Sequence, residues 1–185
     1  MSDPTYGPAL GFLETSSLAK GIEAADAMLK KASVELLLTT MVPRGKYLVM
    51  VGGPVADVES ALQAGREVAG QTLLDDFLIQ GVHPQLPAAI KGRVPVAELA
   101  AVGIIETKEV ASAIFAGDAA AKAAAVTLIE ARNQPGGKGL VVLTGDVGAV
   151  EAAVAAGVAT VKKEGMLVSH VVIPAPHAAL RKALL

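Results

Sequence analysis

The residues that could most readily do chemistry in this chain are a glycine-rich turn and three histidines. Gly136-Gly137-Lys138 is similar to the end of a phosphate-binding loop, but that motif needs glycine where Arg132 lies and serine or threonine where Gly139 lies. We therefore favour a hairpin turn over a nucleotide site. The histidines have no metal-site spacing and no acidic cluster beside them, which favours structural roles for His83, His170 and His177.

Two glutamates lie in equivalent places, Glu14 and Glu106, each followed by a threonine at the end of a predicted strand. Carboxylates there could serve acid–base catalysis, but capping of local backbone groups is the commoner role and the one we favour. Ser169 and His170 are neighbours on a predicted strand and so point to opposite faces of the sheet, which excludes them as a catalytic pair. No set of residues predicts an enzyme.

Composition limits the remaining classes. The chain has no cysteine, which excludes disulfides, thiolate catalysis and cysteine-ligated metal centres. A net charge of −2 gives no electrostatic basis for nucleic-acid binding. No apolar run is long enough to cross a membrane and no secretion signal is evident, so we expect a cytoplasmic protein. Because 52% of residues are apolar, we expect much surface to be covered by subunit contacts.

The elements that position these residues occur twice. Residues 9–65 align without a gap on residues 101–157, and 25 of the 57 aligned positions are identical. A repeat of this length is too long for a solenoid unit and long enough to be a small domain. We therefore predict two domains, residues 1–93 and 94–185, joined by a short linker over residues 91–100.

Hydrophobic spacing predicts the same order of elements in each repeat. In the first, strands are expected over 8–14, 34–42, 47–51 and 74–79, with helices over 18–31 and 55–68 and a short tail helix over 84–90. In the second, strands are expected over 102–106, 126–131, 140–144 and 167–173, with helices over 110–122 and 147–161. The order β-α-β-β-α-β is that of a ferredoxin-like α/β (α+β) sandwich.

Several strings resemble the shell domains of bacterial microcompartments. They are ALGFLET and AVGIIET at the first strands, DAMLK and DAAAK at the helix ends, GDVGAV from Gly145 and the ending VIPAPH at His177. The resemblance covers nearly the whole chain. Two copies in unpermuted order resemble the tandem-domain shell proteins that form trimers, and among these the single-layer type of propanediol-utilisation shells.

The resemblance implies a homotrimer that forms a pseudohexagonal disc and assembles edge to edge with other shell proteins around encapsulated enzymes. In this family the hairpin loops line a central pore for small metabolites. Carried over, the pore-lining residues are Val42, Pro43, Arg44, Gly45, Lys46, Gln134, Pro135, Gly136, Gly137 and Lys138. Arg44 departs from the small residue usual at the constriction, so we expect it to favour anions. The alternative is that Arg44 folds back onto a nearby carboxylate or carbonyl.

The resemblance also implies shell-edge contacts through Lys30, Lys122 and His177. An arginine is frequent between the last prolines of the family, where this chain has Ala175. Some relatives hold an iron–sulfur cluster at the pore through a cysteine, but proline is at that position here, so no cofactor is expected. Two alternatives stay open: a trimeric small-molecule-binding regulatory protein, and an enzyme whose site assembles between subunits.

Overall fold

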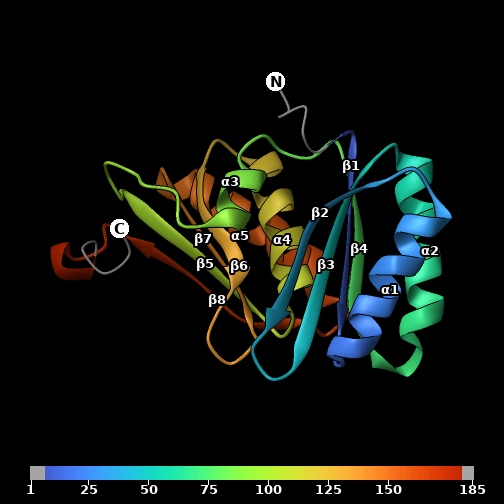
Figure 1. Ribbon diagram of the computed structural model, residues 1–185. Helices are drawn as coiled ribbons and strands as arrows, with labels where there is room; N and C mark the ends of the chain where they lie inside the picture. The colour runs from blue at the N-terminus through green and yellow to red at the C-terminus, as the bar shows by residue number, and fades with distance from the viewer. Residues whose placement is uncertain (1–6, 181–185) are drawn as a thin grey trace. The chain divides into compact units, whose positions relative to one another are not determined.

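The first repeat forms one antiparallel sheet with two helices on one of its faces. The computed structural model describes residues 7–180. In chain order, the first repeat contains β1 (Ala9–Thr15), α1 (Leu18–Lys31), β2 (Glu35–Val42), β3 (Lys46–Gly53), α2 (Val55–Ala69), a 3-10 turn (Gly70–Thr72) and β4 (Leu73–Gln80) (Figure 1). The strand order is β2-β3-β1-β4, which confirms the predicted ferredoxin-like order.

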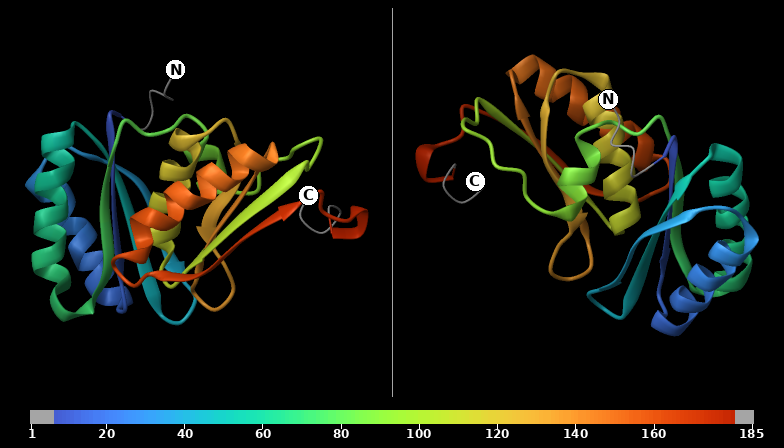
Figure 2. Two further views of the ribbon diagram at one scale, coloured as in Figure 1. Left: turned by 180° about the vertical axis from the view of Figure 1, so that it is seen from behind. Right: turned by 45° about the horizontal axis from the view of Figure 1, so that its top comes forward.

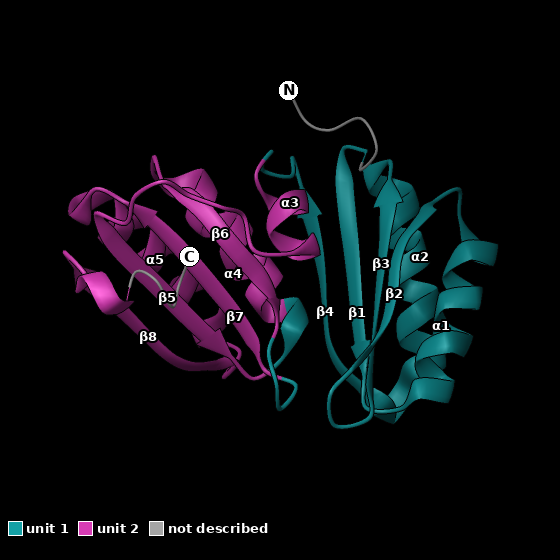
Figure 3. Ribbon diagram, turned by 60° about the vertical axis from the view of Figure 1, so that its left-hand side comes forward, with its two compact units in different colours: residues 1–84, 109–111, 134–137 teal, residues 85–108, 112–133, 138–185 magenta. Residues whose placement is uncertain are grey.

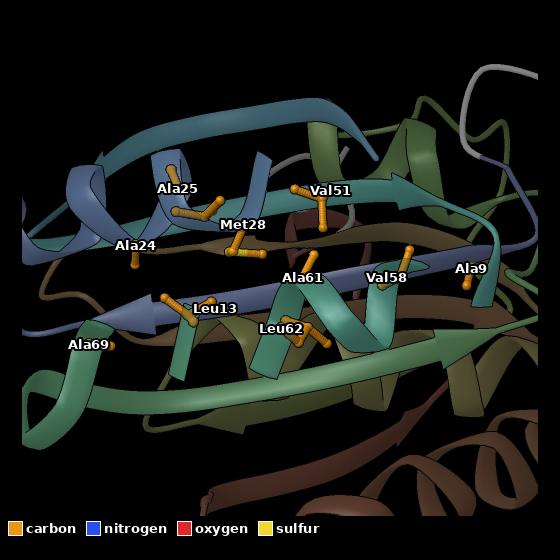
Figure 4. Packing of buried hydrophobic residues seen from close by; sticks show 11 residues of the cluster. Ala9, Leu13, Ala24, Ala25, Met28, Val51, Val58, Ala61, Leu62 and Ala69 are labelled. Atoms are coloured by element: carbon orange, nitrogen blue, oxygen red, sulfur yellow. The ribbon is translucent and has the colours of Figure 1, made fainter. Parts of the chain in front are cut away.

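The helices of the first repeat pack side by side (Figure 2). Ser17 begins α1 because its side-chain oxygen accepts a hydrogen bond from the amide of Lys20 at 3.3 Å. One face of α1 then buries small residues and Met28, and Met28 packs closely against Gly65 of α2. Figure 4 shows this core, in which Leu13 of β1 meets side chains of both helices.

The second repeat follows the same plan. It contains β5 (Ala101–Thr107), α4 (Val110–Ala123), β6 (Thr127–Asn133), β7 (Gly139–Gly145), α5 (Val147–Lys162) and β8 (Leu167–Pro174), with the strand order β6-β7-β5-β8. Even the irregularities recur: the register shifts after Glu14 in β1 and after Glu106 in β5. The predicted pair of matching folds is therefore confirmed in detail.

The compact units of the structure do not follow a single cut in the chain. Unit 1 contains residues 1–84 together with the short segments 109–111 and 134–137, and unit 2 contains the remaining residues (Figure 3). Both short segments belong by sequence to the second repeat. The expected domain boundary between residues 93 and 94 separates the two sequence repeats, and as a domain boundary it stays a prediction.

Residues after the first repeat bind the edge strand of the second sheet, within unit 2. The helix α3 (Leu86–Lys91) packs against β6. The side chain of Gln85 donates to the carbonyl of Val126 at 3.0 Å and accepts from the amide of Leu128 at 2.7 Å. These bonds satisfy backbone groups that an edge strand otherwise leaves open.

Candidate functional site

The two hairpin turns are the first candidate for a functional site, and they have matching backbone conformations. Arg44 and Gly45 both have positive φ, at 73° and 74°, and their counterparts Gly136 and Gly137 have φ of 89° and 75°. Glycine adopts such angles without a steric penalty, whereas arginine does not. Arg44 is therefore held in a conformation that the second repeat gives to glycine.

The tips of both turns are exposed. Pro43, Arg44 and Gly45 are exposed, as are Pro135 and Gly136. Of the residues beside the tips, Val42, Lys46 and Gly137 are buried, whereas Lys138 is exposed. Arg44 makes no hydrogen bond or ion pair within residues 7–180, so the alternative in which it folds back onto a nearby group gains no support.

Lys46 is the centre of a buried cluster of charges in unit 1. Its Nζ donates to Glu14 Oε1 at 2.6 Å, to Glu109 Oε2 at 2.5 Å and to the carbonyl of Gly137 at 2.5 Å. The side chains of Lys46 and Glu14 are 9% and 0% exposed. A buried ammonium is tolerated only where such partners replace water, so Lys46 has a structural role. We call the contacts that Lys46 and Glu14 make in unit 1 the joint.

The sequence had led us to expect that Glu14 caps local backbone groups. Instead, Glu14 caps a helix that begins almost one hundred residues later. Its Oε2 accepts the amides of Val110 at 2.7 Å and Ala111 at 3.1 Å, the first amides of α4. Burial raises the pKa of Glu14, and the hydrogen bond and charge of Lys46 oppose that rise. The positive end of α4 also favours the carboxylate.

The equivalent pair in the second repeat has the same geometry and a different environment. Lys138 Nζ donates to Glu106 Oε1 at 2.6 Å, as Lys46 does to Glu14. The two side chains are 46% and 32% exposed. Glu109, the second acid at Lys46, has Ser17 as its counterpart in the first repeat.

The predicted shell-edge residues lie apart from the turns in sequence and are partly exposed. Lys30 pairs with Asp26 at 2.6 Å on the exposed surface of α1. Lys122 pairs with Asp118 at the equivalent place of α4, where the carboxylate is buried. His177 is exposed and accepts the amide of Ala179 at 3.2 Å. Their role in contacts at the shell edge stays a prediction.

The described residues contain no candidate metal centre. Between residues 7 and 180 no group of three or more acidic or histidine side chains could hold a metal ion. No helix in that part of the chain is long and apolar enough to span a membrane. The predicted histidines stay separate, since His83 follows β4, His170 lies on β8 and His177 follows it.

Reasoning from sequence missed the partners of Lys46. The available signal was that Glu14 and Lys46 are both repeated, as Glu106 and Lys138, at a constant offset. A charged pair kept in both repeats points to a shared contact. In the register of β1 and β3, Glu14 is directly opposite Leu48. Lys46 is two residues before Leu48, so its side chain lies on the same face of the sheet as Glu14.

Comparison with known proteins gives a consistent result. The BMC domain family matches residues 9–82 and 101–176. The chain is 43% identical over 171 residues to the bacterial microcompartment shell protein PduT of Citrobacter freundii, covering 91% of this chain and 93% of that protein. It is 29% identical to the carboxysome assembly protein CcmO of Synechococcus elongatus, covering 95% of this chain and 68% of that protein. The crystal structure of a microcompartment protein from Desulfitobacterium hafniense DCB has a TM-score of 0.79 at 49% identity, covering 94% of this chain and 98% of that one.

Proposed function

This chain belongs to the BMC domain family, and on that premise we propose that it is a structural shell protein of a bacterial microcompartment, in which three copies form a pseudohexagonal ring with a central pore. Family membership rests on the match of both repeats, and the relatives with this role match nearly the whole chain. A ring of three chains contains six similar repeats, so a single fold can tile a sheet.

The observation that carries the proposal is the doubled fold itself. Each repeat has the same four-stranded sheet and the same positive-φ hairpin turn, and each turn ends at a lysine paired with a glutamate. A ring that brought the turns together at its axis would surround an opening with alternating Arg44 and Gly136 tips. Three exposed guanidinium groups near one axis would favour small anions over cations.

The other functions considered have less support. No relative reported above is a regulatory small-molecule-binding protein, and that alternative is not supported. The structural role of the relatives favours a protein without catalytic activity. A location in the shell, in contact with other shell proteins, follows from the same relatives.

Negative-stain electron microscopy of the purified full-length chain tests the proposal. We expect ring-shaped particles that associate laterally into sheets, tubes or hexagonal arrays as salt and concentration are varied. Mass photometry of the dissolved particles should give three copies. Particles that never associate laterally under any of these conditions would contradict the role as a shell tile.

A further inference from the structure

The two repeats are alike in sequence and fold, but the same surfaces are covered in one and open in the other. The joint in unit 1 shows what a covered surface looks like: Lys46 and Glu14 together contact the carbonyl of Gly137 and the amides of Val110 and Ala111. Replacing every residue of the joint by its counterpart in the other repeat gives a second set of groups, the open groups, which form no joint of this kind within residues 7–180. They are the pair Lys138–Glu106, the carbonyl of Gly45, and the amides of Leu18 and Ala19.

Each of these open groups is available for a partner. Lys138 and Glu106 bind each other but stay about one-half and one-third exposed. Leu18 and Ala19 are the first residues of α1, so their amides have no acceptor within the helix, and none occurs elsewhere in residues 7–180. Gly45 is exposed at the tip of its turn. The charged half and the amide half lie in different repeats of the same chain.

An apolar surface beside these amides has the same asymmetry. A groove of about 410 Å³ is lined by Leu18, Ile22, Thr39, Thr40, Met41 and Tyr47. Ile22 is 55% exposed, whereas its counterpart Ile114 on α4 is 0% exposed. Val110, the counterpart of Leu18, is buried as well. The groove is therefore the uncovered version of a surface that the second repeat buries.

The edge strands differ in the same sense. Within unit 2, Gln85 and α3 cover the edge strand β6, and Leu86 is 0% exposed. The corresponding edge strand β2 is largely exposed. The segment between β5 and β8 is two residues longer than the segment between β1 and β4. The counterpart of Leu86 is therefore Leu180, and Leu180 is 38% exposed. Within residues 7–180, the edge strand β2 is therefore largely exposed, and the segment that contains Leu180, the counterpart of Leu86 in α3, is exposed as well.

We infer that a second copy of this chain completes the joint: Lys138 and Glu106 of one copy bind the Gly45 carbonyl and the Leu18 and Ala19 amides of the next. The occupant is a second copy because the same chain contains both halves of the contact, and because unit 1 already contains the finished version of it. An interface between two different surfaces of one protein is head-to-tail and closes into a ring or extends as a filament. The inference rests on the proposed ring for closure at three copies.

The joint between copies is not identical to the joint inside unit 1. Glu109 supplies a second carboxylate to Lys46, but Ser17 is its counterpart and carries no charge. The joint between copies therefore contains one lysine and one glutamate, both from the same copy, whereas the joint within unit 1 contains one lysine and two glutamates. Alternate positions around the ring differ in charge, which a ring of six identical domains could not achieve.

Neutralising one member of the exposed pair tests the contact. Glu106→Gln and Lys138→Met should each weaken assembly of the full-length chain. In mass photometry, the protein concentration at which half of the chains are assembled should rise at least tenfold. Thermal unfolding of the dissociated chain should change little, because both side chains are partly exposed. Glu67→Gln removes an exposed carboxylate of α2 and should leave dissociation unchanged.

Hydrogen exchange of the peptide containing Leu18 and Ala19 provides a second measurement. In the assembled wild-type chain these amides should exchange at least tenfold more slowly than in dissociated Glu106→Gln. Assembly that is insensitive to both substitutions, with freely exchanging amides, overturns the inferred joint even if sheets form. Assembly that depends on the pair but yields filaments or rings that never tile supports the joint and contradicts the shell-tile function. A chain that stays monomeric at every concentration overturns both.

Discussion

At the scale of single residues, Arg44 combines an unfavourable backbone conformation with an exposed charge that has no ion-pair partner among residues 7–180. A left-handed conformation costs a residue with a side chain roughly 1–2 kcal/mol relative to glycine. The second repeat avoids this cost with Gly136 in the same conformation. A strained residue at a predicted pore is a reason to expect a functional role for its guanidinium.

We expect Arg44→Gly to stabilise the chain by about 1 kcal/mol, because relief of the left-handed strain exceeds the added flexibility of glycine in the unfolded state. Urea unfolding at one protein concentration measures the change. The matched substitution, Gly136→Arg, should destabilise by a similar amount. Equal stabilities for all three proteins would mean that the turn relaxes around arginine.

Arg44→Glu should reverse the charge preference of the pore without disturbing assembly. Three carboxylates in place of three guanidinium groups would attract cations and repel anions, with an expected change of roughly tenfold in relative entry. The measurement is uptake of matched anionic and cationic solutes into reconstituted shells. Arg44→Gln separates loss of charge from its reversal. If uptake of both solutes is unchanged, Arg44 does not control the passage.

The raised pKa of Glu14 predicts a pH dependence with a definite sign. A carboxyl group that holds its proton more tightly when folded contributes stability at low pH that is lost as pH rises through its folded pKa. The stability of the wild type relative to Glu14→Gln should therefore fall as pH rises from about 4.5 towards neutrality. Urea unfolding across this range, with Glu67→Gln as baseline, checks the slope. A rising difference would mean that pairing with Lys46 outweighs burial.

At the scale of elements, the two repeats achieve the same packing of helix and hairpin with different side chains. Gly21 of α1 is so close to Tyr47 of β3 that an added Cβ would lie 2.6 Å from the tyrosine Cβ. In the second repeat the two counterparts are Ala113 and Gly139, so the small residue has moved to the other element. Close contact is preserved because the two changes compensate.

This exchange predicts non-additive substitutions. Gly21→Ala should destabilise by about 1–3 kcal/mol through overpacking. Adding Tyr47→Gly, which reproduces the pair found in the second repeat, should recover part of that loss. A double-mutant cycle by urea unfolding should therefore show a coupling of roughly 0.5–3 kcal/mol. Additive effects would show that the space around Gly21 adjusts independently of Tyr47.

At the scale of the whole molecule, assembly depends on surfaces that one chain leaves uncovered. The inferred joint concerns contacts within a ring, whereas Lys30 and Lys122 are predicted to act between rings. Lys30 extends from α1 with its side chain 74% exposed, and Lys122 is tied to a buried carboxylate of Asp118. The two lysines therefore begin from different constraints despite their equivalent positions.

We expect Lys30→Ala to impair sheet formation while leaving trimers intact, because its salt bridge to Asp26 is exposed and contributes little to stability. Lys122→Ala should impair sheets and also lower stability, because it removes a cation from a buried carboxylate. Electron microscopy scores sheets and mass photometry scores trimers. Lys20→Ala, another exposed lysine of α1, serves as control. Loss of trimers on Lys30→Ala would assign it to contacts within the ring.

Local chemistry made much of the architecture predictable. The spacing of apolar residues predicted a helix over residues 18–31, and the structure has α1 at Leu18–Lys31 with Ser17 as its cap. The duplication and the order of elements predicted two ferredoxin-like repeats, and the strings at the first strands indicated the family. These features depend on short-range propensity and on similarity between segments, both of which are visible in a linear chain.

Only the tertiary structure decided which equivalent residues have equivalent roles. Lys46 and Lys138 are the same in sequence, yet one is buried among Glu14, Glu109 and Gly137 while the other remains exposed beside Glu106. Burial depends on which distant segments meet, and a repeat by itself does not specify that. The sequence by itself determined the duplicated fold, and the folded chain determined which copy of each contact is complete.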